Sequence, residues 1–263
     1  MIRRVDPITV VGLGMLLMPL LTMWHEIGGH AAFCAVQGGH VQTIGAFYVD
    51  CDGLAGAPRV LMSCAGVLVN ALLSVIAFIA WRRSRSDRAR LVLWLVWVSE
   101  AFVAAGYLCF SGVTGFGDLA TGTAGQGLGA VPMPIVWRVG EFLLGAAVYA
   151  LVIIRAIKAL ATMIGNGPDT RPVRQLIAHG YYATVGAAAV LVGLLNPVGV
   201  VVTIMSAAAS SFGGLAGMIS IGFATRPEPG PKDFVVGRSW LVFALGAATL
   251  LTFALVLGPS RNF

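Results

Sequence analysis

Three ionisable side chains, His25, Glu26 and His30, lie in the sequence HEIGGH at the end of an apolar stretch. Histidines four residues apart on an α-helix are about 40° apart around its axis, so both can bind one metal ion while a neighbouring glutamate acts as general base on water. Here the histidines are five residues apart, which is about 140° on a regular helix. Either the pair does not chelate, or the helix carries an extra residue as a π-bulge, which Gly28-Gly29 would make cheap.

The elements that position these residues are predicted to be membrane-spanning helices. The chain has 263 residues, of which 58% are hydrophobic and 11% charged, so a water-soluble fold could not bury its apolar surface. Only Asn196-Pro197 separates the fifth candidate span from the sixth, so the number of transmembrane helices is six or seven. We therefore predict an all-α polytopic membrane protein of one domain, 1–263. Candidate spans cover about 8–36, 60–81, 91–112, 135–157, 177–196, 198–223 and 240–258.

The positions of the Lys and Arg residues predict how the helices are oriented in the membrane. Of the 17 Lys and Arg residues, all but Arg59, Arg138 and Arg261 lie in alternate loops, in the N-terminal segment or at adjoining helix ends. Because cytoplasmic loops are enriched in Lys and Arg, the N-terminus and the Arg-rich loop 82–90 are predicted to be cytoplasmic. This charge pattern reports topology and gives no reason to expect a nucleic-acid partner.

Residues 38–58 contain alternating apolar residues and glycines, which predict a β-hairpin or re-entrant segment after the first helix. Non-helical backbone at membrane depth requires protein or a wet cavity beside it, so we expect a cavity next to HEIGGH. The four cysteines form no CxxC pair, and three of them lie in apolar stretches; a disulfide framework is not expected.

Three more polar residues lie near this region. Glu100, in the middle of an apolar helix, must face the bundle interior, where it could be a metal ligand, a partner that orients a histidine, or a structural group. His40 follows two glycines and is a weaker ligand candidate. Asn70 could pack helices together or face a substrate.

Two families share motifs with this chain. HEIGGH matches at every fixed position the H-E-x-x-G-H motif of dipeptidyl peptidase III, in which both histidines bind zinc, although the match covers only six residues. Residues 20–150 resemble, more broadly, the small bacterial branch of site-2-protease-like intramembrane metallopeptidases. The resemblance rests on HEIGGHAAFCAVQGGHVQTI, on the turn-like Ala65-Gly66-Val67-Leu68-Val69-Asn70, and on Gly117-Asp118-Leu119 followed by Pro132 and Trp137.

The resemblance implies an intramembrane zinc metallopeptidase in a bacterial plasma membrane. His25, His30 and Asp118 would hold one Zn²⁺, and Glu26 would be the general base. The substrate would be a membrane-embedded or membrane-adjacent polypeptide, pairing as a strand with segment 38–58. The metallopeptidase core would be 1–157, with 158–263 as additional transmembrane helices. Many proteins of the family cut near the cytoplasmic side, whereas the charge pattern and helix length place HEIGGH and Asp118 toward the outer face.

Two other functions remain open from the sequence. The site-2-protease-like family commonly has an N-x-x-P…L-D-G sequence, which this chain lacks. This absence and the lengthened histidine spacing favour a non-proteolytic metal-binding protein, or a degenerate subunit of a membrane assembly. The Asn196-Pro197 break and the glycine-rich 111–129 loop favour a transporter with broken helices, although the inverted internal symmetry expected of such a protein is not visible.

Overall fold

The computed structural model describes residues 5–121, 127–226 and 233–263. Six helical segments in these ranges are long and apolar enough to cross a membrane, and a seventh helix, α10 (Trp240–Val256), is shorter. The predicted all-α polytopic architecture with six or seven spans is therefore confirmed. The six are α1–η1–α2 (Pro7–Met23, Trp24–Ala31, Ala32–Val36), α3 (Ala57–Arg83), α4 (Asp87–Thr114), α5 (Pro134–Ile164), η2–α6–η3–α7 (Pro168–Thr170, Arg171–Gln175, Leu176–Gly180, Tyr181–Gly193) and α8–η4–α9 (Val200–Val202, Thr203–Gly213, Gly217–Phe223).

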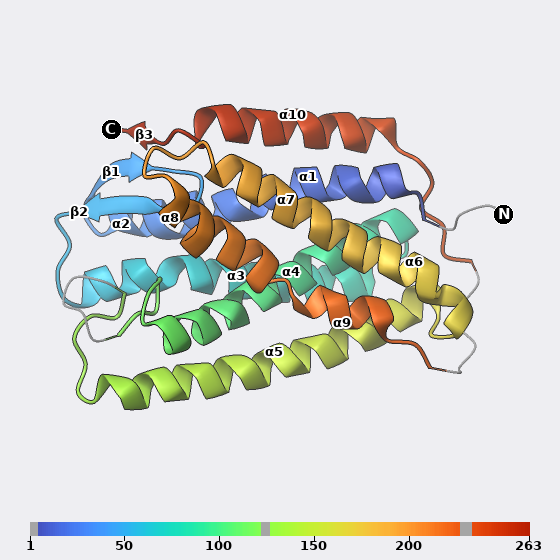
Figure 1. Cartoon of the computed structure of the whole chain (residues 1–263), viewed down its shortest axis with the longest axis horizontal. Coiled ribbons are helices and arrows are strands. Elements are labelled where there is room, and N and C mark those ends of the chain that lie inside the picture. The colour runs from blue at the N-terminus through green and yellow to red at the C-terminus, as the bar shows by residue number, and fades with distance from the viewer. Residues whose placement is uncertain (1–4, 122–126, 227–232) are drawn as a thin grey trace.

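The spans lie along one axis and alternate in direction, so the start of α1 and the end of the chain are at opposite ends of the bundle (Figure 1). Asn196-Pro197 lies in a tight turn, in which the Asn196 side chain accepts a hydrogen bond from the Val198 amide. The fifth and sixth predicted spans are therefore separate helices, and α7 packs against η4.

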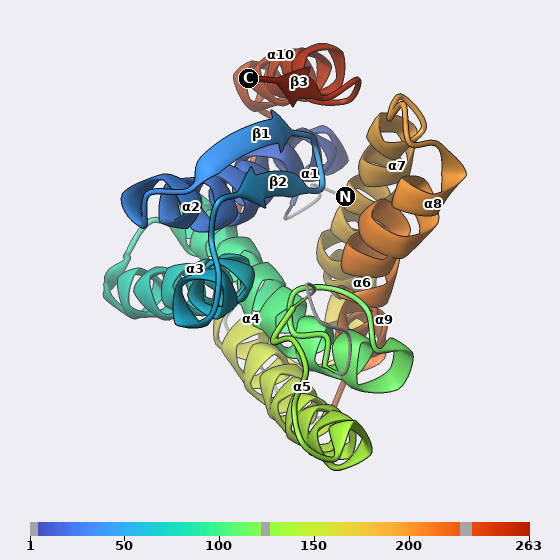
Figure 2. The same cartoon turned by 90° about the vertical axis from the view of Figure 1, so that its left-hand side faces the viewer.

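Helix α4 is the centre of the bundle. It packs against α3, α5 and η4, and its buried face carries large side chains that include Trp94, Leu95 and Phe102. Figure 2, viewed along the bundle, shows α4 between these neighbours. The outward faces of α3, α5 and α10 expose many large apolar side chains, as expected of surfaces that contact lipid.

The predicted hairpin after the first helix is confirmed. Strand β1 (His40–Ile44) pairs antiparallel with β2 (Val49–Asp52), with Ile44 opposite Val49, and the C-terminal β3 (Arg261–Asn262) pairs with the other edge of β1. The sheet order β2-β1-β3 leaves β2 at an edge. The sheet lies at the end of the bundle where α2 ends and packs against η1 (Figure 1).

The expectation that the chain lacks a disulfide is wrong. Cys34 in α2 is bonded to Cys51 in β2, with 6.1 Å between their Cα atoms. Helix α2 ends two residues after Cys34, and the hairpin folds back over it, so that a cysteine in an apolar stretch meets one in a strand. Cys64 and Cys109 are free.

Candidate metal centre

The HEIGGH segment forms a π-helix, η1, over Trp24–Ala31. The wider turn brings the two imidazoles together, with 3.2 Å between the Nε2 atoms of His25 and His30. The bulge that the sequence requires for chelation is therefore present. The two glycines also allow close packing, because a Cβ at Gly28 would lie 2.7 Å from the Trp24 ring and one at Gly29 2.7 Å from the Cα of Gly66 in α3.

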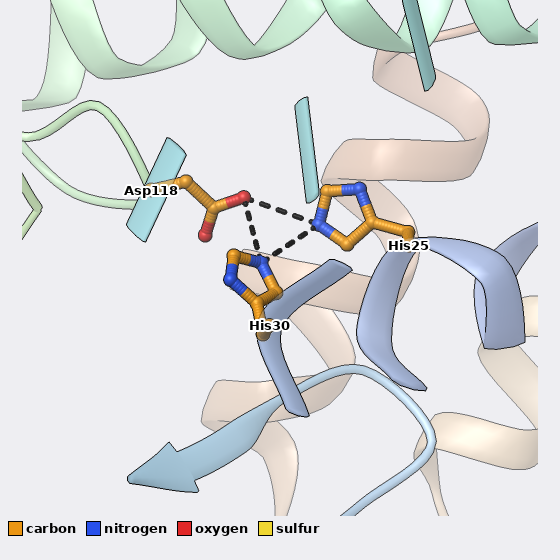
Figure 3. Close-up of side chains that lie close together, drawn as sticks. All are labelled: His25, His30 and Asp118. Atoms are coloured by element: carbon orange, nitrogen blue, oxygen red, sulfur yellow. Dashed lines mark hydrogen bonds and ion pairs between the residues drawn. The ribbon is translucent and has the colours of Figure 1, made fainter. Parts of the chain in front are cut away.

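Asp118 completes a group of three potential metal ligands. Its Oδ2 atom lies 3.1 Å from His25 Nε2 and 3.3 Å from His30 Nε2 (Figure 3). The aspartate comes from the segment after α4, where Gly115 and Gly117, at φ 73° and 90°, turn the backbone toward the histidines. Two imidazole nitrogens and one carboxylate oxygen, all within 4.8 Å of one another, could hold a metal ion.

The opposite edge of each imidazole is fixed by a hydrogen bond. His25 Nδ1 lies 3.0 Å from Asn70 Oδ1, and His30 Nδ1 lies 2.8 Å from the Met62 carbonyl oxygen. Because both partners are acceptors, each Nδ1 carries a proton, so Nε2 is the atom that faces the group and can bind a metal ion when it is unprotonated. Asn70 is 2% exposed and contacts a predicted ligand across the contact between α3 and η1.

Gly66 leaves the space in which the imidazoles meet. A Cβ at this position would contact Nε2 of both His25 and His30. Gly66 and Asn70 are four residues apart on α3 and therefore share the face that packs on η1. The sequence motif Ala65–Asn70 indicated this helix face, but it gave no reason to single out the glycine.

Glu26 lies beside the group in a buried position. It is 4% exposed, and its Oε2 atom accepts no hydrogen bond from the residues that the structure describes. Glu26, His30 and Asp118 line one cavity of about 410 Å³. The ring of Tyr107 stacks on His25, with 5.0 Å between the ring centroids. A carboxyl group next to the potential ligands, on the wall of the same cavity, has the position required of a general base.

The charge state of Asp118 is the one that a metal ligand requires. Burial alone would raise the pKa of its carboxyl, but the neighbouring His30 and the hydrogen bonds from His25 and His30 outweigh it and hold the pKa well below its usual range. Asp118 is therefore ionised at neutral pH, which is the form that binds a cation.

Comparison with known proteins assigns no family. No family model, curated protein or solved structure matches the chain. The resemblance to site-2-protease-like peptidases stays a prediction from the motifs, and functional inference rests on the geometry of the group.

Two predicted candidates lie apart from the three ligands. His40 is exposed at the start of β1. Glu100 is buried in α4 and lines a second, smaller cavity, which also reaches His25 and Glu26. Neither belongs to the metal-ligand group found among the described residues.

The 410 Å³ cavity is also lined by residues of helices that lie outside the predicted metallopeptidase core 1–157. Met205, Ser206 and Ser210 of η4 line it together with His30, and so do Phe47–Val49 of the hairpin. The later helices thus form part of the cavity wall.

Proposed function

We propose that the protein is an intramembrane zinc metallopeptidase that hydrolyses a peptide bond in a membrane-embedded or membrane-adjacent polypeptide. The observation that carries the proposal is the convergence of the His25, His30 and Asp118 donor atoms beside the unpartnered carboxylate of Glu26, on one cavity. Three protein ligands leave a coordination position open, as in catalytic rather than structural zinc sites.

The donor set favours zinc over harder cations. Two neutral imidazoles and one carboxylate suit Zn²⁺, whereas Ca²⁺ and Mg²⁺ prefer oxygen ligands alone. When bound, zinc would supply Lewis-acid polarisation of the scissile carbonyl and of the attacking water.

The residues of the chain would do the remaining work. Glu26 would take a proton from the attacking water and give it to the leaving amine, because its side chain lines the cavity beside the potential ligands. Asn70 and the Met62 carbonyl would hold the imidazoles in the ligating tautomer. The edge strand β2 contributes Val49 to the cavity wall, so an extended substrate segment could pair with it.

The test uses the full-length protein in detergent or liposomes and a panel of membrane-protein substrates. Glu26→Gln is expected to lower cleavage by about 10²- to 10⁴-fold, the usual contribution of a general base, while the zinc content stays unchanged. His25→Ala/His30→Ala is expected to remove both zinc and cleavage, and His40→Ala serves as the matched control that keeps both. Cleavage that persists in Glu26→Gln overturns the mechanism.

The same measurements address the non-proteolytic alternative. Zinc that depends on His25 and His30, without cleavage that depends on Glu26, would favour metal handling over proteolysis. Equal, substoichiometric zinc in wild type and in the double histidine variant would show that the site is degenerate.

A further inference from the structure

The segment 260–263, which follows α10, binds the hairpin along one edge of β1. Strand β3 lies beside β1 (Figure 1), and the Phe263 amide donates to the Gln42 carbonyl oxygen at 2.9 Å. Phe253 of α10 packs edge to face on Phe47 in the hairpin turn, with 6.2 Å between the ring centroids. The last helix and strand are thus attached to a turn that is far from them in the sequence.

Ser260 connects this segment to two other turns. Its Oγ atom lies 2.9 Å from Tyr48 Oη, in the turn between β1 and β2, and accepts a hydrogen bond of 3.2 Å from Asn196 Nδ2, in the turn between α7 and α8. Asn196 is itself fixed, because it is 5% exposed and its Oδ1 atom accepts a hydrogen bond from the Val198 amide. One hydroxyl group therefore joins three segments of the chain.

The backbone of Ser260 has a conformation that serine rarely adopts. Its φ is 63°, and it is one of two non-glycine residues with a positive φ in the described part of the chain. Such a conformation costs free energy and persists only where the surrounding contacts fix it. The bonds to Tyr48 and Asn196 are the side-chain hydrogen bonds of Ser260 within the described ranges, so they are the polar contacts that can do so.

Both partners of Ser260 lead to a wall of the metal cavity. Tyr48 lines the cavity, together with its neighbours Phe47 and Val49. The turn that contains Asn196 leads directly into α8 and η4, and η4 supplies a second part of the lining. Ser260 itself is not among the residues that line the cavity, so any effect that it has there passes through these two walls.

We propose that Ser260 is a positioning residue that holds two walls of the metal cavity, the hairpin turn and the start of α8–η4, in a fixed relation to each other. We call Ser260, Tyr48 and Asn196 the clamp. The hairpin carries the edge strand β2, so the clamp sets how the cavity accepts an extended polypeptide; this part of the inference rests on the proposed function. Releasing the clamp frees both walls and leaves the metal ligands in place.

The first test is amide hydrogen exchange, measured by mass spectrometry on the full-length protein in detergent. The amides of Gly45 and Gly199 report on the two walls, because each closes a turn with a backbone hydrogen bond of 2.9 Å. Ser260→Ala and Ser260→Gly should both speed exchange in 45–48 and 196–199 by about 2- to 10-fold, the effect of one lost hydrogen bond between neutral groups. Glycine adopts a positive φ freely, so Ser260→Gly removes the hydroxyl group without backbone strain.

Two variants separate the clamp from a general loss of stability. Tyr48→Phe removes only the bond to the hairpin, so exchange should rise in 45–48 and stay unchanged in 196–199. Ser239→Ala removes a hydroxyl group that accepts from the Val242 amide at the other end of α10, and it should leave both turns unchanged. Exchange that is unchanged in both turns of both Ser260 variants overturns the proposal.

The second test compares cleavage with zinc content. In Ser260→Gly, the KM for a membrane-polypeptide substrate should rise by about 2- to 10-fold, while kcat and the zinc per chain keep their wild-type values. A lower kcat with an unchanged KM would show that Ser260 serves only the stability of the fold, and would overturn its role in accepting substrate. If the wild type cleaves no substrate, the proposed peptidase is wrong, and the exchange measurements alone decide on the clamp.

Discussion

At the residue scale, the metal centre depends on a glycine that makes no polar contact. Replacing Gly66 with alanine would put a methyl group against Nε2 of both His25 and His30. We expect Gly66→Ala to remain folded but to lose bound zinc, measured per chain by elemental analysis. Gly140→Ala is the control, since a Cβ there meets no atom within 4 Å. Full zinc occupancy in Gly66→Ala would contradict the proposed ligand geometry.

Asn70 tests the same centre through the opposite edge of His25. Because its Oδ1 accepts the Nδ1 proton, Asn70→Leu should weaken zinc binding by about 10- to 100-fold, as measured by competition with a chelator. Asn70→Asp keeps an acceptor and should restore most of the affinity. If the two variants bind zinc equally, the hydrogen bond does not orient the ligand and Asn70 serves only in helix packing.

At the element scale, the π-helix explains why a lengthened motif can still chelate. Deleting Gly28 converts HEIGGH to HEIGH, which places the histidines four apart, about 40° around a regular α-helix. We expect this deletion variant to bind zinc. Inserting an alanine after Gly28 increases the spacing to six and should abolish binding. Zinc loss in the deletion variant together with retention in the insertion variant would show that η1 is not the element that sets the ligand geometry.

The hairpin is held to the first span by the bond between Cys34 and Cys51, 17 residues apart. Cross-linking a loop of about this length reduces the entropy of the unfolded chain and stabilises the folded state by about 3 kcal/mol. Cys34→Ser/Cys51→Ser should lower the free energy of unfolding of the purified protein by that order. Cys109→Ser, which removes a free thiol, is the control. An unchanged free energy would mean that the hairpin is held by its packing on η1 alone.

The sequence predicts those elements that depend on local pattern. Apolar length predicts the spans, and alternating residues in 38–58 predict a hairpin or a re-entrant segment. The histidine spacing beside Gly28-Gly29 offers the π-bulge as one of two alternatives, the other being that the pair does not chelate. Contacts between distant segments are not encoded locally. Cys34 and Cys51 meet only because the hairpin folds back on α2, and Asn70 meets His25 only because α3 packs on η1. Asp118 came from a family resemblance, since nothing in its own loop distinguishes a ligand from a solvated aspartate.

At the scale of the whole molecule, the two ends of the bundle differ in charge and chemistry. The metal centre, the sheet and the disulfide lie at one end, while the Arg-rich 82–90 connection between α3 and α4 lies at the other (Figure 1). Cytoplasmic loops are enriched in Lys and Arg, and disulfides persist in oxidising compartments. These two independent signals both predict that the metal centre lies on the non-cytoplasmic side.

This orientation can be measured with a membrane-impermeant maleimide. In a Cys64→Ser/Cys109→Ser background expressed in a bacterial plasma membrane, Phe263→Cys at the exposed C-terminus should be labelled in cells whose outer barrier is permeabilised, because β3 adjoins the hairpin. Ser86→Cys, exposed between α3 and α4, should be labelled only after the plasma membrane is disrupted. The reverse pattern would place Cys34 and Cys51 in a reducing compartment, where their bond would not persist, and would bring the metal centre to the cytoplasmic side. If the proposed peptidase function is correct, the labelling pattern thus decides on which side of the membrane a substrate must present its scissile bond.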